Sequence, residues 1–187
     1  VFQRPRLQYC REGLRCDPQD LRQALSIHTR KITDSCRDND CIEDLRFYPK
    51  LQYVDDDPTS YDTIFSSAKT DVTENDQARL IEALKKLSAG DLSAVDQDAM
   101  IRYLVVHDFL QNGDSYTGML VHNYHLYEED GVLSMIPWDY NLAFGTFQGN
   151  QAVNAVNDDI DSPLSVTGND RPMIDWIFSS EEYTELY

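Results

Sequence analysis

Residues 112–145 read NGDSYTGMLVHNYHLYEEDGVLSMIPWDYNLAFG, and the rest of the chain is organised around them. Two runs in which apolar and polar residues alternate flank Asp130-Gly131, a pair that favours a tight turn between antiparallel strands. We therefore expect a central β-hairpin at about 119–137. Asp114 lies in a loop before the hairpin and Asp139 in a loop after it, so the hairpin brings two carboxylates to one end.

The register of this hairpin is left open by the sequence. A turn of two, three or four residues places His122, Val121 or Leu120 opposite Asp139. In each of these registers Asn123 lies within a few residues of Asp139 across the strand pair. A site shared by the two carboxylates and Asn123 is therefore feasible.

Helices are expected before the hairpin. Thr73 to Asp76 forms a capping pattern with an acid at its last position, and apolar residues follow at helical spacing until Gly90 ends the helix. A second helix begins between Ser93 and Asp98 and ends at Asn112-Gly113. This second helix delivers the chain directly to Asp114.

Shorter elements are expected on either side of this region. Leu51–Val54 alternates in polarity, as a short strand does. Residues 145–170 are rich in Gly, Asn, Asp and Gln and indicate a long loop. One helix is expected from Arg171-Pro172 and another from Ser180 to Tyr187, where an amphipathic pattern stops at the last residue and indicates a longer native chain.

The composition is that of a globular protein with an acidic surface. The chain has 187 residues, of which 41% are hydrophobic and 26% charged. It contains no apolar run long enough to predict membrane insertion and no visible signal peptide. A net charge of −17 and a pI of about 4.4 argue against nucleic-acid partners and favour basic ones. Oligomeric state and compartment are left open.

The first 50 residues differ from the rest and are set apart as an N-terminal segment of unknown role, with the main domain at 51–187. The segment holds most of the arginines and all four cysteines. The cysteine spacing C-x5-C-x19-C-x4-C fits zinc sites poorly, and two disulfides or four free thiols remain equally open. These cysteines are Cys10, Cys16, Cys36 and Cys41.

Each candidate site residue also has an ordinary structural interpretation. Asp114 follows a helix stop, where a carboxylate commonly caps backbone amides in a turn. Asn123 lies in an otherwise apolar and aromatic strand, where a lone Asn is usually a satisfied polar group. Asp139 is harder to explain in this way, because apolar residues on both sides predict that it is partly buried and needs a partner, a metal or a proton.

The order of these residues indicates phosphoryl transfer. Protein kinases place a catalytic Asp, a metal-binding Asn and a metal-binding Asp before an aromatic-Gly pair in the same order. In that chemistry the first Asp orients the acceptor hydroxyl, and the Asn and the second Asp hold Mg²⁺ against the phosphates of ATP. Here Asn123 follows Asp114 by nine residues rather than about five, and Asp139 begins Asp-Tyr-Asn-Leu-Ala-Phe-Gly. This is therefore not an ordinary protein kinase sequence.

Several of these motifs closely resemble the spore coat protein CotH family of atypical protein kinases, over about residues 51–187. The motifs are NGDSY at 112–116, HNYHLY at 122–127, IPWDYNLAFG at 136–145, DSPL at 161–164 and RPMIDW at 171–176. The resemblance implies an α+β fold, mostly helical around the hairpin and similar to the C-terminal lobe of protein kinases. It also implies phosphate transfer from ATP to serines of basic, serine-rich coat or surface proteins.

The resemblance assigns roles to the site residues. It implies Asp114 as the catalytic Asp and Asp139 as a Mg²⁺-binding Asp at the ATP site. Asn123 as a second metal ligand is inferred from the order of the residues.

The N-terminal segment departs from the family pattern. The family has an N-terminal lobe that supplies cationic groups to the ATP phosphates, and residues 1–50 do not resemble it, so this lobe is expected to be missing. Arg30, Lys31 and Arg46 are the candidate substitutes. The alternative function is a non-catalytic pseudokinase or scaffold that binds partners without phosphoryl transfer.

Overall fold

The computed structural model describes residues 50–118, 120–121, 123–147, 153, 157–160 and 171–187. The predictions for the N-terminal segment, including its four cysteines and the substitute phosphate contacts, lie outside the described residues. Most of the expected loop at 145–170 lies outside them as well.

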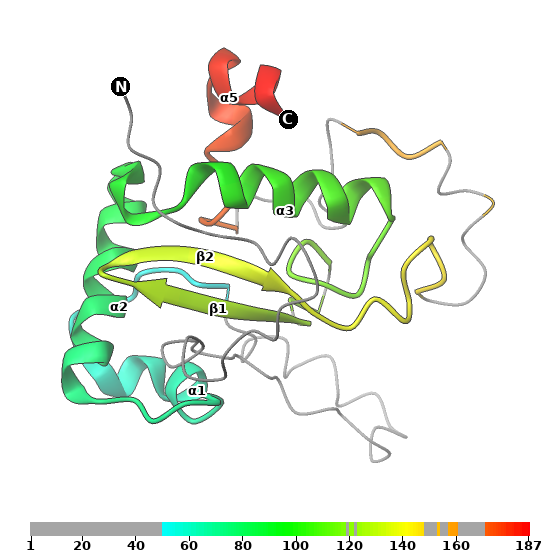
Figure 1. Cartoon of the computed structure of the whole chain (residues 1–187). Coiled ribbons are helices and arrows are strands. Elements are labelled where there is room, and N and C mark those ends of the chain that lie inside the picture. The colour runs from blue at the N-terminus through cyan, green and yellow to red at the C-terminus, as the bar shows by residue number, and fades with distance from the viewer. Residues whose placement is uncertain (1–49, 119, 122, 148–152, 154–156, 161–170) are drawn as a thin grey trace, which may run out of the picture.

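The described chain is a mixed α+β structure, and this part of the fold prediction is confirmed. A single two-stranded antiparallel sheet forms its centre within the described residues, and the helices surround it (Figure 1). In order, the elements are η2 Pro58–Tyr61, α1 Asp62–Phe65, α2 Glu74–Ser88, η3 Leu92–Ala94, α3 Gln97–Phe109, β1 Tyr124–Glu129, β2 Val132–Pro137, η4 Ile177–Ser179 and α5 Glu181–Leu186. No helix in the described part is long and apolar enough to cross a membrane.

The hairpin turn has two residues, which selects one of the three expected registers. Asp130 and Gly131 both have positive φ, 53° and 83°, as a type I′ turn requires, and Glu129 pairs with Val132. Pairing ends at Tyr124 opposite Pro137. The expected hairpin at 119–137 is therefore right at its C-terminal end and too long at its N-terminal end.

The first strand starts late because the chain before Tyr124 is not extended. Val121 and Asn123 have φ values of 50° and 55°, in the left-handed region. A β-branched residue such as Val121 rarely adopts the left-handed conformation, and this conformation interrupts a strand. The polarity alternation continues through this segment, but its backbone forms the approach to the strand.

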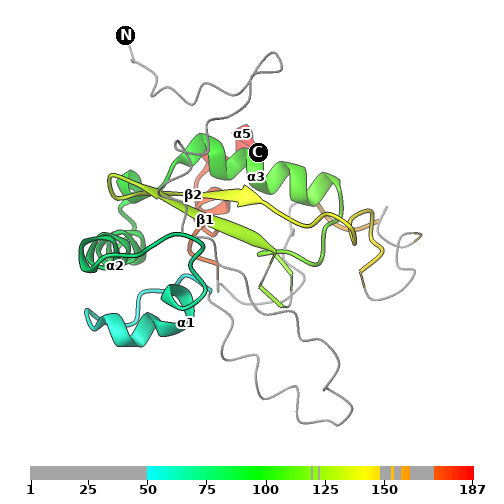
Figure 2. The same ribbon diagram turned by 60° about the horizontal axis from the view of Figure 1, so that its bottom comes forward.

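One face of the hairpin is buried and the other is partly exposed. Tyr124, Leu126 and Glu128 on β1 share the buried face with Leu133 and Met135 on β2. Helix α3 lies along the hairpin in both views (Figures 1 and 2). Its start is fixed to β2, because Asp96 N–H donates to the Leu133 carbonyl at 2.9 Å and Val95 forms a bridge with the same residue.

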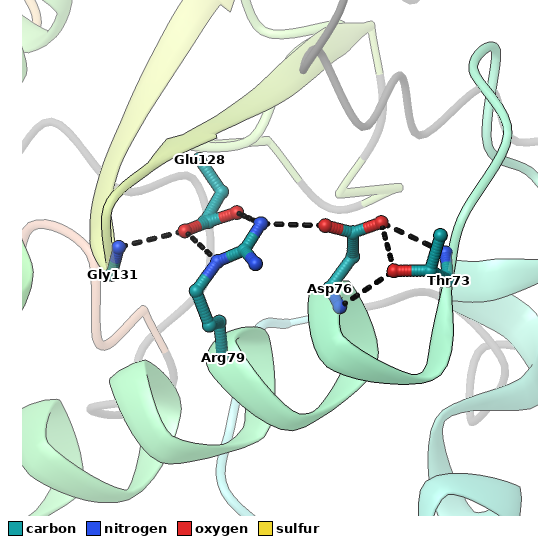
Figure 3. Close-up of polar contacts among 5 residues, drawn as sticks. All are labelled: Thr73, Asp76, Arg79, Glu128 and Gly131. Atoms are coloured by element: carbon teal, nitrogen blue, oxygen red, sulfur yellow. Dashed lines mark hydrogen bonds and ion pairs between the residues drawn. The ribbon is translucent and has the colours of Figure 1, made fainter.

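A carboxylate sits in this otherwise apolar face and is neutralised by an arginine from α2. Glu128 is 1% exposed and accepts two hydrogen bonds from Arg79, at 2.9 and 3.0 Å. It also accepts the N–H of Gly131 in the hairpin turn at 2.7 Å. Asp76 contacts Arg79 from the other side and is itself bonded to Thr73 (Figure 3). The network joins the start of α2 to the turn of the hairpin.

The expected helix starts are confirmed at three places. Thr73 and Asp76 form the reciprocal capping box at the start of α2. Asp96 caps α3, whose predicted start fell between Ser93 and Asp98, and Ser180 caps α5. Each cap is a local feature, which is why the sequence was sufficient to locate it.

Two expected elements are wrong. Leu51–Val54 forms no strand: Leu51 has a φ of 60°, and the Val54 and Asp55 amides donate to the Tyr61 hydroxyl instead of to a sheet. The expected α-helix from Arg171 is a series of turns that ends in η4. Most of its amides bond three residues back, as Ile177 N–H does to the Ile174 carbonyl, which is 3₁₀-type spacing, and only Asp175 N–H bonds four back, to the Arg171 carbonyl.

Replacing Arg79 with Met should destabilise the protein by about 2–3 kcal/mol, because a buried carboxylate is then left without its cation. That figure lies below the usual cost for a fully buried pair because the Arg79 side chain is 36% exposed, so solvent screens part of the interaction. Arg102→Met is the matched control, since its ion pair with Asp98 is mostly exposed and removing it should change little. Urea unfolding measures both, and equal midpoints for the two variants would contradict the assigned role of Arg79.

Candidate functional site

Asp114 and Asn123 are in direct contact. The side-chain nitrogen of Asn123 donates to the backbone carbonyl of Asp114 at 2.8 Å and to its Oδ2 at 3.0 Å. Asp114 is 7% exposed and Asn123 has a left-handed backbone, at a φ of 55°, which turns its side chain back toward the loop. The structure therefore brings these two residues together, and the Asn123 amide orients the Asp114 carboxylate. Their catalytic and metal-binding roles stay predictions.

The loop that carries Asp114 is closed on itself. Gly118 N–H donates to the Ser115 carbonyl at 3.0 Å, and the Ser115 hydroxyl bonds to the Asn112 carbonyl at 2.8 Å and to the Thr117 hydroxyl at 2.9 Å. A Cβ atom on Gly118 would lie 1.9 Å from the Gly113 carbonyl oxygen. Only glycine permits this closeness of the two backbone segments on either side of Asp114.

A buried arginine from the C-terminal part of the chain holds the same loop. Arg171 is 1% exposed, and its guanidinium donates to the Tyr116 carbonyl at 2.8 Å and to the Gly118 carbonyl at 3.0 Å. The Tyr116 side chain contributes on its own side by donating its hydroxyl to the Lys50 carbonyl at 2.9 Å. Segments from both ends of the described chain therefore meet at the Asp114 loop.

Asp139 lies in a second loop, half-buried and at a φ of 52°. This loop is tied to the C-terminal end of α3, where the Asp114 loop begins. Phe144 N–H donates to the Leu110 carbonyl, and Gly145 N–H donates to the Gln111 carbonyl at 3.1 Å. Both loops leave the hairpin at the end opposite to its turn, as both views show (Figures 1 and 2).

A histidine on α3 holds the residue that follows Asp139. The Nδ1 atom of buried His107 lies 2.9 Å from the Tyr103 carbonyl, which makes Nδ1 the protonated nitrogen and leaves Nε2 as an acceptor. The Tyr140 hydroxyl lies 3.3 Å from Nδ1 and 3.4 Å from Nε2, and of these two atoms only Nε2 can accept its hydrogen. Burial lowers the pKa of His107 to about 4 and raises the pKa of Tyr140 to about 12, so the pair is neutral near pH 7.

The three predicted site residues are brought together in part. Asp114 and Asn123 touch, whereas within the described part of the chain no hydrogen bond joins Asp139 to either of them. Asp139 is connected to them through the end of α3, by the backbone bonds of Phe144 and Gly145. The structure thus places the two carboxylates on two loops that share one support.

The oxygen donors of these loops are of the chemical type that magnesium prefers. Two carboxylates and the Asn123 amide oxygen are hard ligands, and Mg²⁺ commonly uses one or two carboxylates and completes its shell with water and phosphate oxygens. Asn112, two residues before Asp114, is 2% exposed, and both polar atoms of its side chain have no hydrogen-bond partner among the described residues. A buried side-chain amide normally has hydrogen-bond partners, so Asn112 is a polar group beside Asp114 that could still bind one. No cluster of three or more His, Cys, Asp or Glu suited to a metal occurs in the described ranges.

Comparison with known proteins gives one family. The profile described as CotH kinase protein matches residues 40–187. The chain belongs to the CotH kinase family. No curated protein and no solved structure matches the chain.

Membership of the CotH family confirms the resemblance found in the motifs. It makes the chain a member of a kinase-type family, for which ATP and a divalent metal are the general requirements. The match begins at residue 40, inside the segment that the sequence analysis set apart, so Cys41 falls within the matched region. The division into residues 1–50 and 51–187 stays a prediction.

Arg171 and His107 are site-supporting residues to which the sequence analysis gave no role. Arg171 opened one of the motifs that carried the resemblance, but its partners lie 53 and 55 residues away, and no local pattern reveals them. His107 could have been noticed as a lone histidine on the apolar face of a predicted helix. That signal is weak, because a satisfied core histidine gives the same pattern.

The stability contributed by His107 should disappear on acidification. The unfolded imidazole titrates near 6.5, and burial lowers the folded pKa of His107 to about 4, so the unfolded state binds its proton first as the pH falls. The contribution is therefore fully present above about pH 6.5, and about 3 kcal/mol of it is lost by pH 4. The free energy of unfolding of wild type should fall more steeply between pH 7 and 4 than that of His107→Gln. Parallel profiles would contradict a buried neutral His107.

Gly118→Ala should disrupt the Asp114 loop, because the new Cβ would overlap the Gly113 carbonyl. Gly113→Ala is the matched control: the nearest atoms to its Cβ would belong to the Phe147 side chain, from 3.3 Å, a contact that a small shift of this side chain relieves. We expect Gly118→Ala to change the amide chemical shifts of residues 113–123, while Gly113→Ala shifts only the signals of the substituted residue and its chain neighbours and those around Phe147. The same small changes in both variants would show that the close approach is not a constraint.

Proposed function

We propose that the chain is an ATP- and Mg²⁺-dependent protein serine/threonine kinase of the CotH type. The observation that carries the proposal is the double hydrogen bond from Asn123 to Asp114, found in a member of a kinase family. The attachment of the Asp139 loop to the same end of α3 supports it. In this proposal the described residues correspond to a kinase-like C-terminal lobe.

The residues divide the chemistry between them. Asp114 accepts the proton of the acceptor serine while the serine oxygen forms a bond to the γ-phosphorus. ADP leaves with the electrons of the broken phosphoanhydride bond. Asn123 fixes the Asp114 carboxylate, so that its lone pairs are oriented before the serine arrives. Asp139 and the Asn123 oxygen are the ligands for Mg²⁺, which when bound neutralises charge on the phosphates.

Basic, serine-rich coat or surface proteins are the substrates we propose. The chain carries a net charge of −17, and most of its acidic residues follow residue 50, whereas most of its arginines precede it. The matched region therefore attracts cationic segments over several ångströms and repels acidic ones.

A non-catalytic, partner-binding role is the second candidate, and the distribution of cations supports it. In the described ranges, Arg79, Lys85 and Arg102 are paired with carboxylates, and Arg171 is buried against backbone carbonyls. Lys50, Lys69 and Lys86 are the other cations there. Few positive charges of this part are therefore available for the ATP phosphates.

Asp114→Asn and Asp139→Asn should each lower the transfer of γ-phosphate to a basic serine-rich peptide by on the order of 100-fold or more, because preorganised electrostatic groups supply most of such a rate. Asp98→Asn is the control, since it removes an equal charge from an exposed position on α3 and should leave the rate unchanged. Radiolabel incorporation with and without Mg²⁺ measures all four proteins. Wild-type labelling no greater than that of Asp139→Asn would refute the kinase proposal.

When labelling is absent, calorimetry with ATP and Mg²⁺ divides the second candidate into a pseudokinase that binds nucleotide and a scaffold that does not. Metal-dependent binding of ATP without transfer to any peptide favours a pseudokinase. Absence of both binding and transfer leaves the partner-binding role.

A further inference from the structure

The conformation of the Asp114 loop depends on one guanidinium that no assigned function uses. Arg171 is among the largest fully buried side chains of the described structure, at 1% exposure. Its Nε donates to the Tyr116 carbonyl at 2.8 Å and its Nη2 to the Gly118 carbonyl at 3.0 Å. The guanidinium carbon also lies 5.7 Å from the centre of the Tyr116 ring. The three contacts fix the position and the orientation of the loop C-terminal to Asp114.

The Gly118 carbonyl connects this contact to Asn123. It accepts Arg171 Nη2 and also the Val121 N–H, at 3.4 Å, and Val121 stands two residues before Asn123. Asn123 in turn holds both the carbonyl and the carboxylate of Asp114. Arg171 therefore supports Asp114 from two directions, through the loop that carries it and through the segment that delivers Asn123.

Arg171 is itself held firmly by the C-terminal segment. The backbone N–H of Arg171 donates to Asp175 Oδ2 at 2.9 Å, and its backbone carbonyl accepts hydrogen bonds from the N–H groups of Ile174 and Asp175. Met173, Ile174 and Ile177, which follow it, are buried in the core. The guanidinium is thus a rigid donor anchored in the core and pointed at the loop.

We propose that Arg171 is a positioning residue for Asp114, whose guanidinium sets the geometry of the loop for phosphoryl transfer. This inference rests on the proposed kinase function only for its effect on the rate of phosphoryl transfer. A planar guanidinium spans two carbonyls with two parallel donors, whereas a lysine ammonium is a point donor that cannot reproduce this geometry.

The kinetic test compares Arg171→Lys with Ile174→Val. Ile174 is 1% exposed in the same segment and does not bond to the loop, so its variant reports the cost of loosening the core alone. At a temperature well below unfolding, we expect Arg171→Lys to lower kcat at least tenfold with KM for ATP within twofold of wild type, and Ile174→Val to retain kcat. An equal fall in kcat for both variants would reduce Arg171 to a core residue and overturn the proposal.

Chemical rescue gives a readout that core packing does not move. Added methylguanidinium, at millimolar concentrations that do not denature, should restore part of kcat in Arg171→Ala and have no effect on Ile174→Val. Absence of rescue in a folded Arg171→Ala, as judged by circular dichroism, would count against the proposal. If Arg171→Ala does not fold, Arg171→Lys carries the test alone.

Hydrogen exchange separates this inference from the proposed function. The Gly118 and Val121 amides, which bond within and beside the loop, should lose protection in Arg171→Lys and keep it in Ile174→Val, while amides of α2 stay protected in both. If the wild type transfers no phosphate but Arg171→Lys loses this protection, the kinase proposal is refuted and the positioning role of Arg171 stands. Unchanged protection of Gly118 and Val121 in Arg171→Lys would overturn the positioning role whatever the activity.

Discussion

The buried carboxylate of Glu128 is the constraint on which the rest of the described structure depends. Its place in the strand alternation puts it on the apolar face of the hairpin, where an ion needs a counter-charge and hydrogen-bond donors. Arg79 supplies the charge and the Gly131 amide supplies a further donor (Figure 3). One side chain thereby fixes the two-residue turn and the position of α2.

The turn has consequences at the other end of the hairpin. A two-residue turn determines which residues face the core, because a slip of one residue would turn every side chain to the other face. With the register fixed, the start of β1 at Tyr124 lies opposite the end of β2 at Pro137. The loops that carry Asp114 and Asp139 join the hairpin at this end. The site is then built by attaching each loop to α3 and to the C-terminal segment.

Prediction from the sequence succeeded where the determining interaction is short in sequence. The capping box at Thr73, the turn at Asp130-Gly131 and the cap at Ser180 each depend on residues within four positions of one another. The predicted strand at Leu51–Val54 failed because Leu51 has a left-handed backbone and the Val54 amide donates to the Tyr61 hydroxyl instead of to a neighbouring strand. The bonds of Glu128 to Arg79 and of Arg171 to Tyr116 join residues 49 and 55 positions apart, and no periodicity in the sequence encodes such pairs.

The same contrast between local and distant interactions applies to the candidate site. The order Asp114, Asn123, Asp139 could be predicted because the three residues lie in motifs that resemble the CotH family, and the matching family profile confirms the membership, while the roles of the three residues stay predictions. The supporting residues were not readable, since a buried arginine and a buried histidine acquire their roles only from partners brought close by the fold. A site of this kind is therefore easier to recognise from its reacting groups than from the residues that hold them.

Backbone strain is concentrated around these loops, and this bears on what the loops are for. Gln111, Val121, Asn123, Asp139 and Phe144 all have positive φ without being glycine. Such conformations persist only where the surrounding contacts enforce them, and they cluster at functional sites. Here the contacts are identifiable: Asn123 is held by its bonds to Asp114, and Phe144 by its bond to Leu110. Three of these residues lie between α3 and β1 and two follow β2, so they fall on the two loops that carry Asp114 and Asp139. Loops that only connected a helix to a strand would have no need for so many such residues, whereas the proposed site requires two carboxylates and an amide in fixed directions.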